Sequence, residues 1–265
     1  MKLGVVLAQL PPTTSVAQNV ESISAAVAAA EPGDVVVTPE GSVSGYFEDL
    51  RFLETLSSEE VESALDTLGA LAEAAGVDLW VGACLRDGRA WRNAAYGLTA
   101  DGLRLRYQKA NLGTTERGVF EPGDSLPTFA LRRDGAEAVV GVQICRDLRF
   151  PEQWRALSES GAAAILHLTS ALSDSPPTIW RSMLVSRAVE NQRFVVSANA
   201  AGRQSSPTLA VAPTGDVIAE CERGDVEVIR VELDLAEAED TYLRQRRLDL
   251  VPSDAAEFRS AQTSN

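Results

Sequence analysis

Histidine and cysteine are scarce in this chain. Its 265 residues include one histidine, His167, and three cysteines. An odd number of widely spaced cysteines predicts neither a disulfide framework nor a zinc site. Disulfide-free chains are typical of reducing compartments, so we expect a cytoplasmic protein.

Positive charge and long apolar runs are also lacking. The chain has 24 Lys and Arg against 38 Asp and Glu, a formal net charge of −14. Nucleic acids and anionic membranes are polyanions, so this balance argues against both as partners. No apolar stretch approaches the ~20 residues that span a bilayer. Pro11 and Pro12 end the first apolar run too early for a signal peptide.

What remains is an ordinary globular composition, with 45% hydrophobic and 23% charged residues. The length suits one large α/β domain or two small ones. No linker, low-complexity tract or charge block divides the chain. We therefore predict a single domain over residues 1–265, with a loose polar tail from about residue 252.

Apolar strand patterns alternate with amphipathic helix patterns. Helices are predicted at 16–31, 57–75, 151–161 and 176–192. Single strands are predicted at 2–10, within 32–40, and at 136–145, 162–170 and 193–202. Tandem antiparallel strands at 78–109 and 208–233 argue against a plain doubly wound sheet. They favour two mixed sheets packed on each other, with helices outside.

One cysteine lies where a buried strand turns polar. The segment GVQICRDLRFPE, residues 141–152, has apolar residues before Cys145 and charged residues directly after it. This position suits a nucleophile, provided that the chain supplies a base and an oxyanion site. His167 is the only candidate base for a Cys–His hydrolase. The alternative is a histidine satisfied by a backbone carbonyl, with a carboxylate or lysine as the base.

Two further charged residues follow predicted strands. Glu40 ends the segment DVVVTPE, and Lys109 lies where an alternating strand enters a loop. Catalytic groups of open α/β folds lie at such strand ends. Glu116 and Glu121 precede a Pro-Gly-Asp turn. Taken alone, each of these residues could equally be a solvated surface charge.

Together these motifs resemble the nitrilase superfamily of carbon–nitrogen hydrolases. The segments, in chain order, are TPEGSVSGY, YQKANL, ERGVFEPGD, GVQICRDLRFPE and SRAVENQRFVVSAN. The similarity extends from the first strand to about Asp234, and the cysteine segment is its most specific part. The resemblance implies an α/β fold, a four-layer α-β-β-α sandwich that forms homodimers or larger homo-oligomers. It also implies a Glu–Lys–Cys catalytic set that needs no metal and no organic cofactor.

Matched by motif, the resemblance implies that Glu40 is the general base, Lys109 the lysine and Cys145 the nucleophile. Glu116 corresponds to a second, supporting glutamate. A thiol of ordinary pKa is mostly protonated at neutral pH, so it needs a base or a nearby cation. Glu40, with its pKa raised by burial, would take the proton. Lys109 would lower the thiol pKa and, with the backbone N–H of Arg146, would stabilise the oxyanion.

SRAVENQ has a structural interpretation. Arg187, Glu190 and Asn191 are spaced three and four apart on a predicted helix. Their side chains can pair with one another and cap neighbouring loops, so we interpret them as scaffold.

The chain departs from the family pattern at two positions near the site. Asn111 stands where the lysine motif usually has a histidine, and it can form hydrogen bonds but cannot titrate. Arg146 replaces an aromatic residue, and at the pocket wall it could bind a substrate carboxylate. Alternatively, Arg146 turns away and pairs with Asp147, Glu152 or another of the many acidic residues. We assign Arg146 and His167 to substrate binding.

The predicted function is a cysteine-dependent amidase that hydrolyses a small carboxamide to the acid and ammonia through a thioester. An alternative is an N-carbamoyl amine or amino-acid amidohydrolase, which also releases carbon dioxide. Nitrile hydrolysis fits the CRDLRFPE segment less well. A catalytically silent binding relative is disfavoured, because Glu40, Lys109 and Cys145 are all present. The sequence leaves the substrate itself open.

Overall fold

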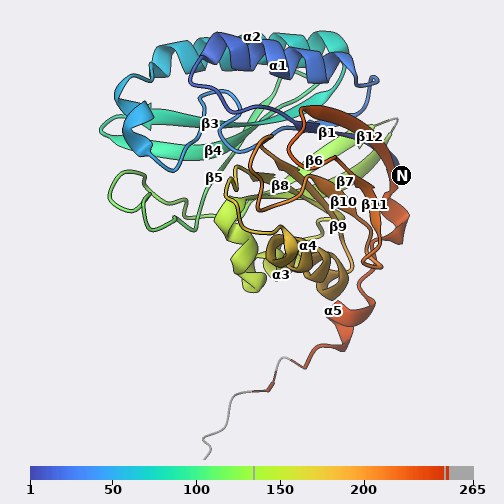
Figure 1. Cartoon of the computed structure of the whole chain (residues 1–265). Coiled ribbons are helices and arrows are strands. Elements are labelled where there is room, and N and C mark those ends of the chain that lie inside the picture. The colour runs from blue at the N-terminus through green and yellow to red at the C-terminus, as the bar shows by residue number, and fades with distance from the viewer. Residues whose placement is uncertain (134, 248, 251–265) are drawn as a thin grey trace, which may run out of the picture.

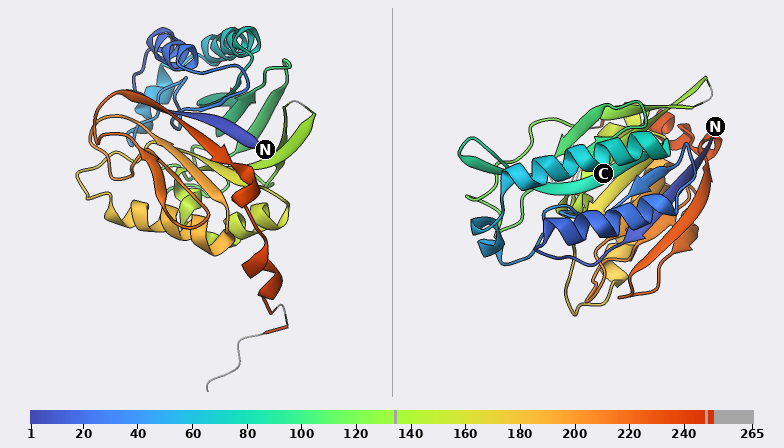
Figure 2. Two further views of the ribbon diagram at one scale, coloured as in Figure 1. Left: turned by 90° about the vertical axis from the view of Figure 1, so that its right-hand side faces the viewer. Right: turned by 90° about the horizontal axis from the view of Figure 1, so that it is seen from above.

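Two six-stranded sheets pack face to face, and helices cover both outer faces (Figure 1). The computed structural model describes residues 1–133, 135–247, 249 and 250. The edge-on view in Figure 2 separates the layers, with α1 and α2 on one side and α3 and α4 on the other. The predicted four-layer α-β-β-α sandwich is therefore confirmed. The predicted loose tail lies outside the described residues.

The first sheet has the strand order β12-β1-β2-β3-β4-β5 and the second β11-β10-β9-β8-β7-β6. The strands of the first sheet are β1 (Lys2–Gln9), β2 (Val35–Val37), β3 (Asp78–Asp87), β4 (Ala90–Leu98), β5 (Arg104–Gln108) and β12 (Glu227–Asp234). Those of the second are β6 (Thr128–Arg133), β7 (Ala136–Ile144), β8 (Ala164–Thr169), β9 (Phe194–Asn199), β10 (Leu209–Val211) and β11 (Val217–Glu220).

The first four α-helices follow the predicted positions closely, whereas the last α-helix and the 3₁₀ helices were not predicted. The α-helices are α1 (Val16–Ala28), α2 (Ser58–Ala75), α3 (Pro151–Glu159), α4 (Thr178–Asn191) and α5 (Thr241–Gln245), with short 3₁₀ helices η1 (Leu50–Glu54), η2 (Cys145–Arg149) and η3 (Leu235–Glu237). Ser15 and Ser57 cap α1 and α2 by accepting backbone N–H groups, and Gly76 ends α2 in the left-handed conformation. No helix in the described ranges is long and apolar enough to cross a membrane.

The predicted meander at the end of the chain is divided between the two sheets. β10 and β11 pair in the second sheet, whereas β12 pairs with β1 in the first. The crossing is anchored by the buried amide of Gln9, which donates to the carbonyls of Glu222 and Asp225 at 2.7 Å each. β12 thereby covers the edge of β1, which would otherwise expose unpaired backbone groups.

An apolar core between the sheets joins the two halves. It contains residues from both, including Leu7, Trp80, Val142 and Phe194. The rings of Trp80 and Phe129 meet edge to face across the layers, with centroids 4.9 Å apart. Because the core fixes one sheet against the other, loops from both sheets keep a defined arrangement at their shared edge.

Strand direction determines which loops meet. β2 and β3 are parallel. β4 is antiparallel to both β3 and β5, so β5 runs in the same direction as β2 and β3. β7, β8 and β9 are parallel in the second sheet. The loops after β2, β5, β7 and β8 carry Glu40, Lys109, Cys145 and Ser170 respectively. The topology thus gathers the predicted catalytic residues from both sheets.

Candidate active site

Cys145 begins η2 directly after β7, in a conformation unusual for its type. Its φ is 45°, in the left-handed region that favours glycine. A non-glycine residue held there costs about 1–3 kcal/mol and persists only when its surroundings enforce it. Of the three cysteines, Cys84 and Cys221 are buried and Cys145 alone is partly exposed. The residue at the start of this turn is therefore the least buried of the three cysteines, although it still packs against the core between the sheets.

Asp147 holds this turn. Its fully buried carboxylate accepts hydrogen bonds from Ile144 N at 3.0 Å and Tyr107 Oη at 2.8 Å. The other carboxylate oxygen accepts from the backbone N and the Nδ2 of Asn111, at 2.9 and 2.8 Å. Asn111 thus fastens the lysine loop to the cysteine turn by hydrogen bonds that need no titratable group.

Glu40 is positioned by a close approach of backbone to backbone. A Cβ at Gly82 in β3 would lie 2.2 Å from Gly41 N, so only glycine lets the Glu40 loop lie against this strand. Gly41 itself has a φ of 62°. The resulting turn buries the Glu40 side chain, with 2% of the residue exposed.

Glu40, Lys109 and Glu116 form a buried ion network. Lys109 Nζ lies 2.7 Å from Glu40 Oε1 and 2.8 Å from Glu116 Oε1. The exposed fraction of each of the three side chains is 2% or less. Asn93 Nδ2 donates to Glu40 Oε1 at 2.7 Å and to Glu116 Oε1 at 3.3 Å. Two carboxylates and one ammonium leave the network one negative charge in excess.

Backbone and hydroxyl donors offset that excess charge. Tyr46 Oη donates to Glu116 Oε1 at 2.7 Å, and the Gly113 N–H donates to Glu116 Oε2. Ser170 N donates to Glu40 Oε2 at 3.2 Å. Sequence patterns had not assigned Tyr46, Asn93 or Ser170. The available signal was weak: Asn93 is a polar residue among the apolar residues that end β4, and Tyr46 ends the glutamate motif TPEGSVSGY.

The two carboxylates have pKa values shifted in opposite directions. Burial raises the pKa of Glu40, and Lys109 only partly offsets this effect. Burial would also raise the pKa of Glu116, but Lys109, Tyr46 and the Gly113 N–H together bring that pKa below its ordinary value. Burial disfavours the charged Lys109, yet Glu40, Cys145 and Glu116 raise its pKa. Lys109 is therefore an ammonium at neutral pH.

The thiol of Cys145 is protonated in the resting site. Burial and the negative charge of Glu40 raise its pKa to about 12, and the opposing effect of Lys109 is smaller. Lys109 lowers the thiol pKa as expected, but burial and Glu40 outweigh its effect. Burial also raises the pKa of Cys84 and Cys221 to about 12. Cys145 is thus distinguished by its exposure and by its neighbours, not by its resting pKa.

His167 contacts the backbone of Cys145 and does not line a pocket wall. Its ring is fully buried, with Nδ1 2.9 Å from Ser197 Oγ and Nε2 3.1 Å from the carbonyl oxygen of Cys145. Burial lowers its pKa to about 4, so the ring is neutral and Nε2–H donates to that carbonyl. The carbonyl-satisfied alternative for His167 is therefore the correct one. Its assignment to substrate binding is corrected, because the ring has no exposed surface.

The SRAVENQ helix supports the cysteine turn, as predicted. Arg187 donates to the carbonyl of Leu148, in η2, through Nε at 3.1 Å and Nη2 at 2.9 Å. Its Nη1 pairs with Glu190 at 2.9 Å. Asn191 Nδ2 donates to the carbonyl of Arg187 at 2.9 Å. These residues are scaffold for η2.

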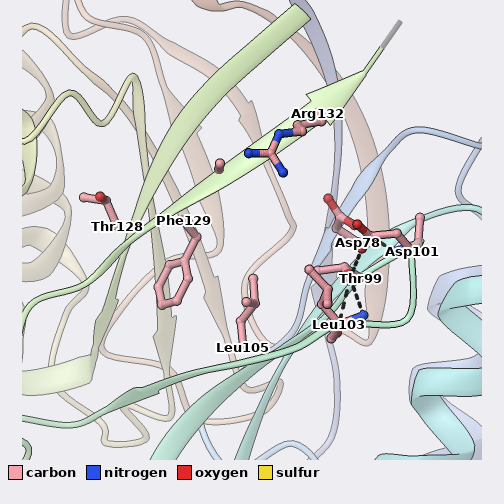
Figure 3. A pocket seen from close by; sticks show the side chains of 10 residues that line it. Asp78, Thr99, Asp101, Leu103, Leu105, Thr128, Phe129 and Arg132 are labelled. Carbon is pink, nitrogen blue, oxygen red and sulfur yellow. Dashed lines mark hydrogen bonds between the residues drawn. The ribbon is translucent and has the colours of Figure 1, made fainter. Parts of the chain in front are cut away.

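Two pockets bear on the search for a substrate site. One, of about 430 Å³, contains Arg146 in its wall. The other, of about 370 Å³, lies between the β4–β5 turn and β6 and is lined by Asp78, Asp101, Leu105 and Phe129 among others (Figure 3). No predicted site residue lines the second pocket. Within the described residues, no cluster of three His, Cys, Asp or Glu side chains could hold a metal ion.

Comparison with known proteins gives a consistent set of relatives. Residues 4–242 match the carbon–nitrogen hydrolase family. An (R)-stereoselective amidase from Pseudomonas sp is 32% identical over 86% of this chain and 85% of its own length. The 2-oxoglutaramate amidase of Bacillus subtilis is 32% identical over 77% of this chain and 80% of its own.

The fold also has close matches among solved structures. The crystal structure of Saccharomyces cerevisiae Nit3, described as a member of branch 10 of the nitrilase superfamily, has a TM-score of 0.79. It is 26% identical in sequence, and the match covers 94% of this chain and 96% of Nit3.

Proposed function

The chain belongs to the carbon–nitrogen hydrolase family, and on that premise we propose that it is a cysteine-dependent amidase. As an amidase-type member of the nitrilase superfamily, it hydrolyses carbon–nitrogen bonds other than peptide bonds. The proposed reaction converts a small carboxamide to the carboxylic acid and ammonia. The observation that carries the proposal is the buried Lys109 ammonium between Glu40 and Glu116, at the edge where Cys145 is presented.

The first step is attack by Cys145 on the amide carbonyl carbon. The Sγ–C bond forms while the thiol proton passes to Glu40, because a thiol with a pKa near 12 is not a nucleophile without a proton acceptor. The carbonyl oxygen becomes an oxyanion. Lys109 uses two of its three N–H donors on carboxylates, which leaves one for the oxyanion. The backbone N–H of Arg146 is the second donor.

The second step breaks the C–N bond. Protonated Glu40 transfers its proton to the amine nitrogen, and ammonia leaves a thioester on Cys145. A water molecule then attacks the thioester carbon while Glu40 accepts a proton from it. Collapse of this intermediate breaks the C–S bond, returns the proton to the thiol and releases the acid. Glu40 returns to its starting protonation state at the end of the cycle. No atom changes its oxidation state in these steps, so no redox step is required.

The opposite pKa shifts support Glu40 rather than Glu116 as the base. Two carboxylates whose surroundings push their pKa values apart take different roles. The raised pKa of Glu40 suits a group that both accepts and returns a proton. The lowered pKa of Glu116 keeps it ionised, so it holds Lys109 in place. We assign His167 the role of a positioning residue that fixes the carbonyl of Cys145.

Two of the relatives are amidases by name, which favours amides over carbamoyl compounds as substrates. No contact in the described site specifically favours the N-carbamoyl alternative. The proposed location is the cytoplasm. We also propose a homo-oligomer, which is consistent with the exposed apolar residues Ile179 and Val189 on α4. Light scattering of the purified protein tests the oligomer, and a monomer at micromolar concentration would refute it.

The function is tested by ammonia release from ω-amides, aliphatic amides and carbamoyl compounds. We expect release from amides by the parent protein and none by Cys145→Ala. Equal release by both proteins would exclude Cys145 as the nucleophile. Release of carbon dioxide together with ammonia from carbamoyl compounds alone would favour the alternative activity.

A further inference from the structure

The pocket of about 430 Å³ contains two arginines, Arg117 and Arg146. Both are exposed to solvent. Within the described part of the chain, neither guanidinium forms an ion pair or a side-chain hydrogen bond. Both groups are therefore available to bind an anionic ligand, although 38 acidic residues are present in the chain. The alternative that Arg146 pairs with Asp147 does not hold, because other donors occupy that carboxylate.

None of Glu40, Lys109 and Cys145 lines the pocket, but its wall is built from their chain neighbours. Three of its lining residues, Ala110, Arg117 and Arg146, directly follow Lys109, Glu116 and Cys145. Gly113 shows how close the approach is. A Cβ built on this glycine would lie 3.0 Å from Glu116 Oε2 and 3.4 Å from Arg146 Nε. The Arg146 guanidinium therefore lies beside the ion network without joining it.

The rest of the wall suits a short apolar chain. Leu112, Phe120 and Phe150 line the pocket, and no acidic residue is among its described lining. The volume is at the lower end of the range for small-molecule sites, about 300–1,000 Å³. Two unpaired guanidinium groups above apolar side chains match a ligand with a carboxylate at one end of a short spacer.

We infer that Arg117 and Arg146 form a carboxylate subsite, which makes the preferred substrate a monoamide of a small dicarboxylic acid. This inference rests on the proposed amidase function and specifies its substrate class. The amide end reaches Cys145 while the carboxylate end lies in the pocket. The same pair repels amides that carry an ammonium group. The subsite selects the substrate by charge and takes no part in proton transfer.

The test compares kcat/KM for three amides of matched length, ending in a carboxylate, a neutral amide or an ammonium group. We expect the parent to prefer the anionic amide over the neutral one. A charge-assisted contact can contribute a ten- to hundredfold preference, and we expect about tenfold per arginine because solvent screens both groups. Arg117→Met and Arg146→Met should each reduce the ratio of anionic to neutral kcat/KM by about that factor. The double variant should remove the preference.

Arg244→Met is the matched control. Arg244 lies on α5, outside the pocket, and its removal changes the net charge equally. We expect the parent ratio in this variant and a smaller ratio at high ionic strength in the parent. A parent that hydrolyses the cationic amide best, or a ratio unchanged in the double variant, overturns the subsite and leaves the amidase proposal standing. A parent that hydrolyses none of the amides overturns the amidase proposal itself.

Discussion

The two sheets contribute to the site in different ways. Loops of the first sheet supply charged side chains, with Glu40 after β2 and Lys109 after β5. Their properties depend on one another, because each charge shifts the pKa of the next. The second sheet supplies a backbone geometry, in which Cys145 has a φ of 45° and neutral His167 holds its carbonyl. In the proposed mechanism, the first sheet supplies the groups that move protons and the second supplies the nucleophile.

This difference has consequences for substitutions. In the ion network, removing one charge changes the protonation of its neighbours, so pH profiles should move. Around the cysteine turn, removing a hydrogen bond loosens a geometry, so kcat should fall while pH profiles stay in place. The experiments below use this contrast, beginning with the largest expected effect.

Cys145→Ala should abolish turnover with little change in stability. The substitution removes the nucleophile, and the partly exposed side chain leaves little cavity in the core. Ammonia release and thermal unfolding of the parent and the variant measure the two effects. Residual turnover within tenfold of the parent would refute the nucleophile assignment.

Glu116→Gln should lower kcat by roughly ten- to a hundredfold and move the acid limb of kcat/KM to lower pH. The negative charge of Glu116 raises the pKa of Glu40, so neutralising it lowers that pKa. Glu40 must be deprotonated to act as the base, and activity then persists further into acid. The pH profile of kcat/KM tests the direction. An acid limb that moves upward would contradict the coupling.

His167→Asn should have the smallest effect, within about tenfold of the parent kcat. The asparagine amide can still donate a hydrogen bond toward the Cys145 carbonyl, and a neutral histidine contributes no charge. The pH profile should be unchanged. An apolar counterpart, His167→Leu, removes the donor and should lose more activity than His167→Asn. A shifted pH profile in either variant would mean that His167 takes part in proton transfer.

The sequence predicted much of this site, for identifiable reasons. Glu40, Lys109 and Cys145 each follow a strand, and their motifs occur in one characteristic order. Asn93 and Tyr46 carry only a weak local signal and Ser170 carries none, because their partners lie 53, 70 and 130 positions away in the chain. Such contacts depend on how the sheets pack.

The fold shows the same contrast between features that local sequence determines and features that depend on how distant segments pack. The helices and most strands follow from local periodicity and caps. β6 was not predicted as a strand, since an edge strand has only one neighbour and a weak apolar pattern. The transfer of β12 to the first sheet depends on pairing with β1, more than 200 positions earlier. The resting pKa of Cys145 also required the three-dimensional balance of burial and charge.

The proposed mechanism separates the proton acceptor, Glu40, from the nucleophile, Cys145. The most direct test of this separation labels Cys145 with iodoacetamide in the parent and in Glu40→Gln and measures ammonia release on the same samples. Removing the Glu40 charge takes away one cause of the raised thiol pKa and leaves Lys109 in place. We therefore predict that Glu40→Gln is still alkylated at Cys145, ahead of Cys84 and Cys221, while its turnover falls about 10²–10⁴-fold. Retained turnover in Glu40→Gln, or alkylation of Cys84 or Cys221 before Cys145, would contradict the account.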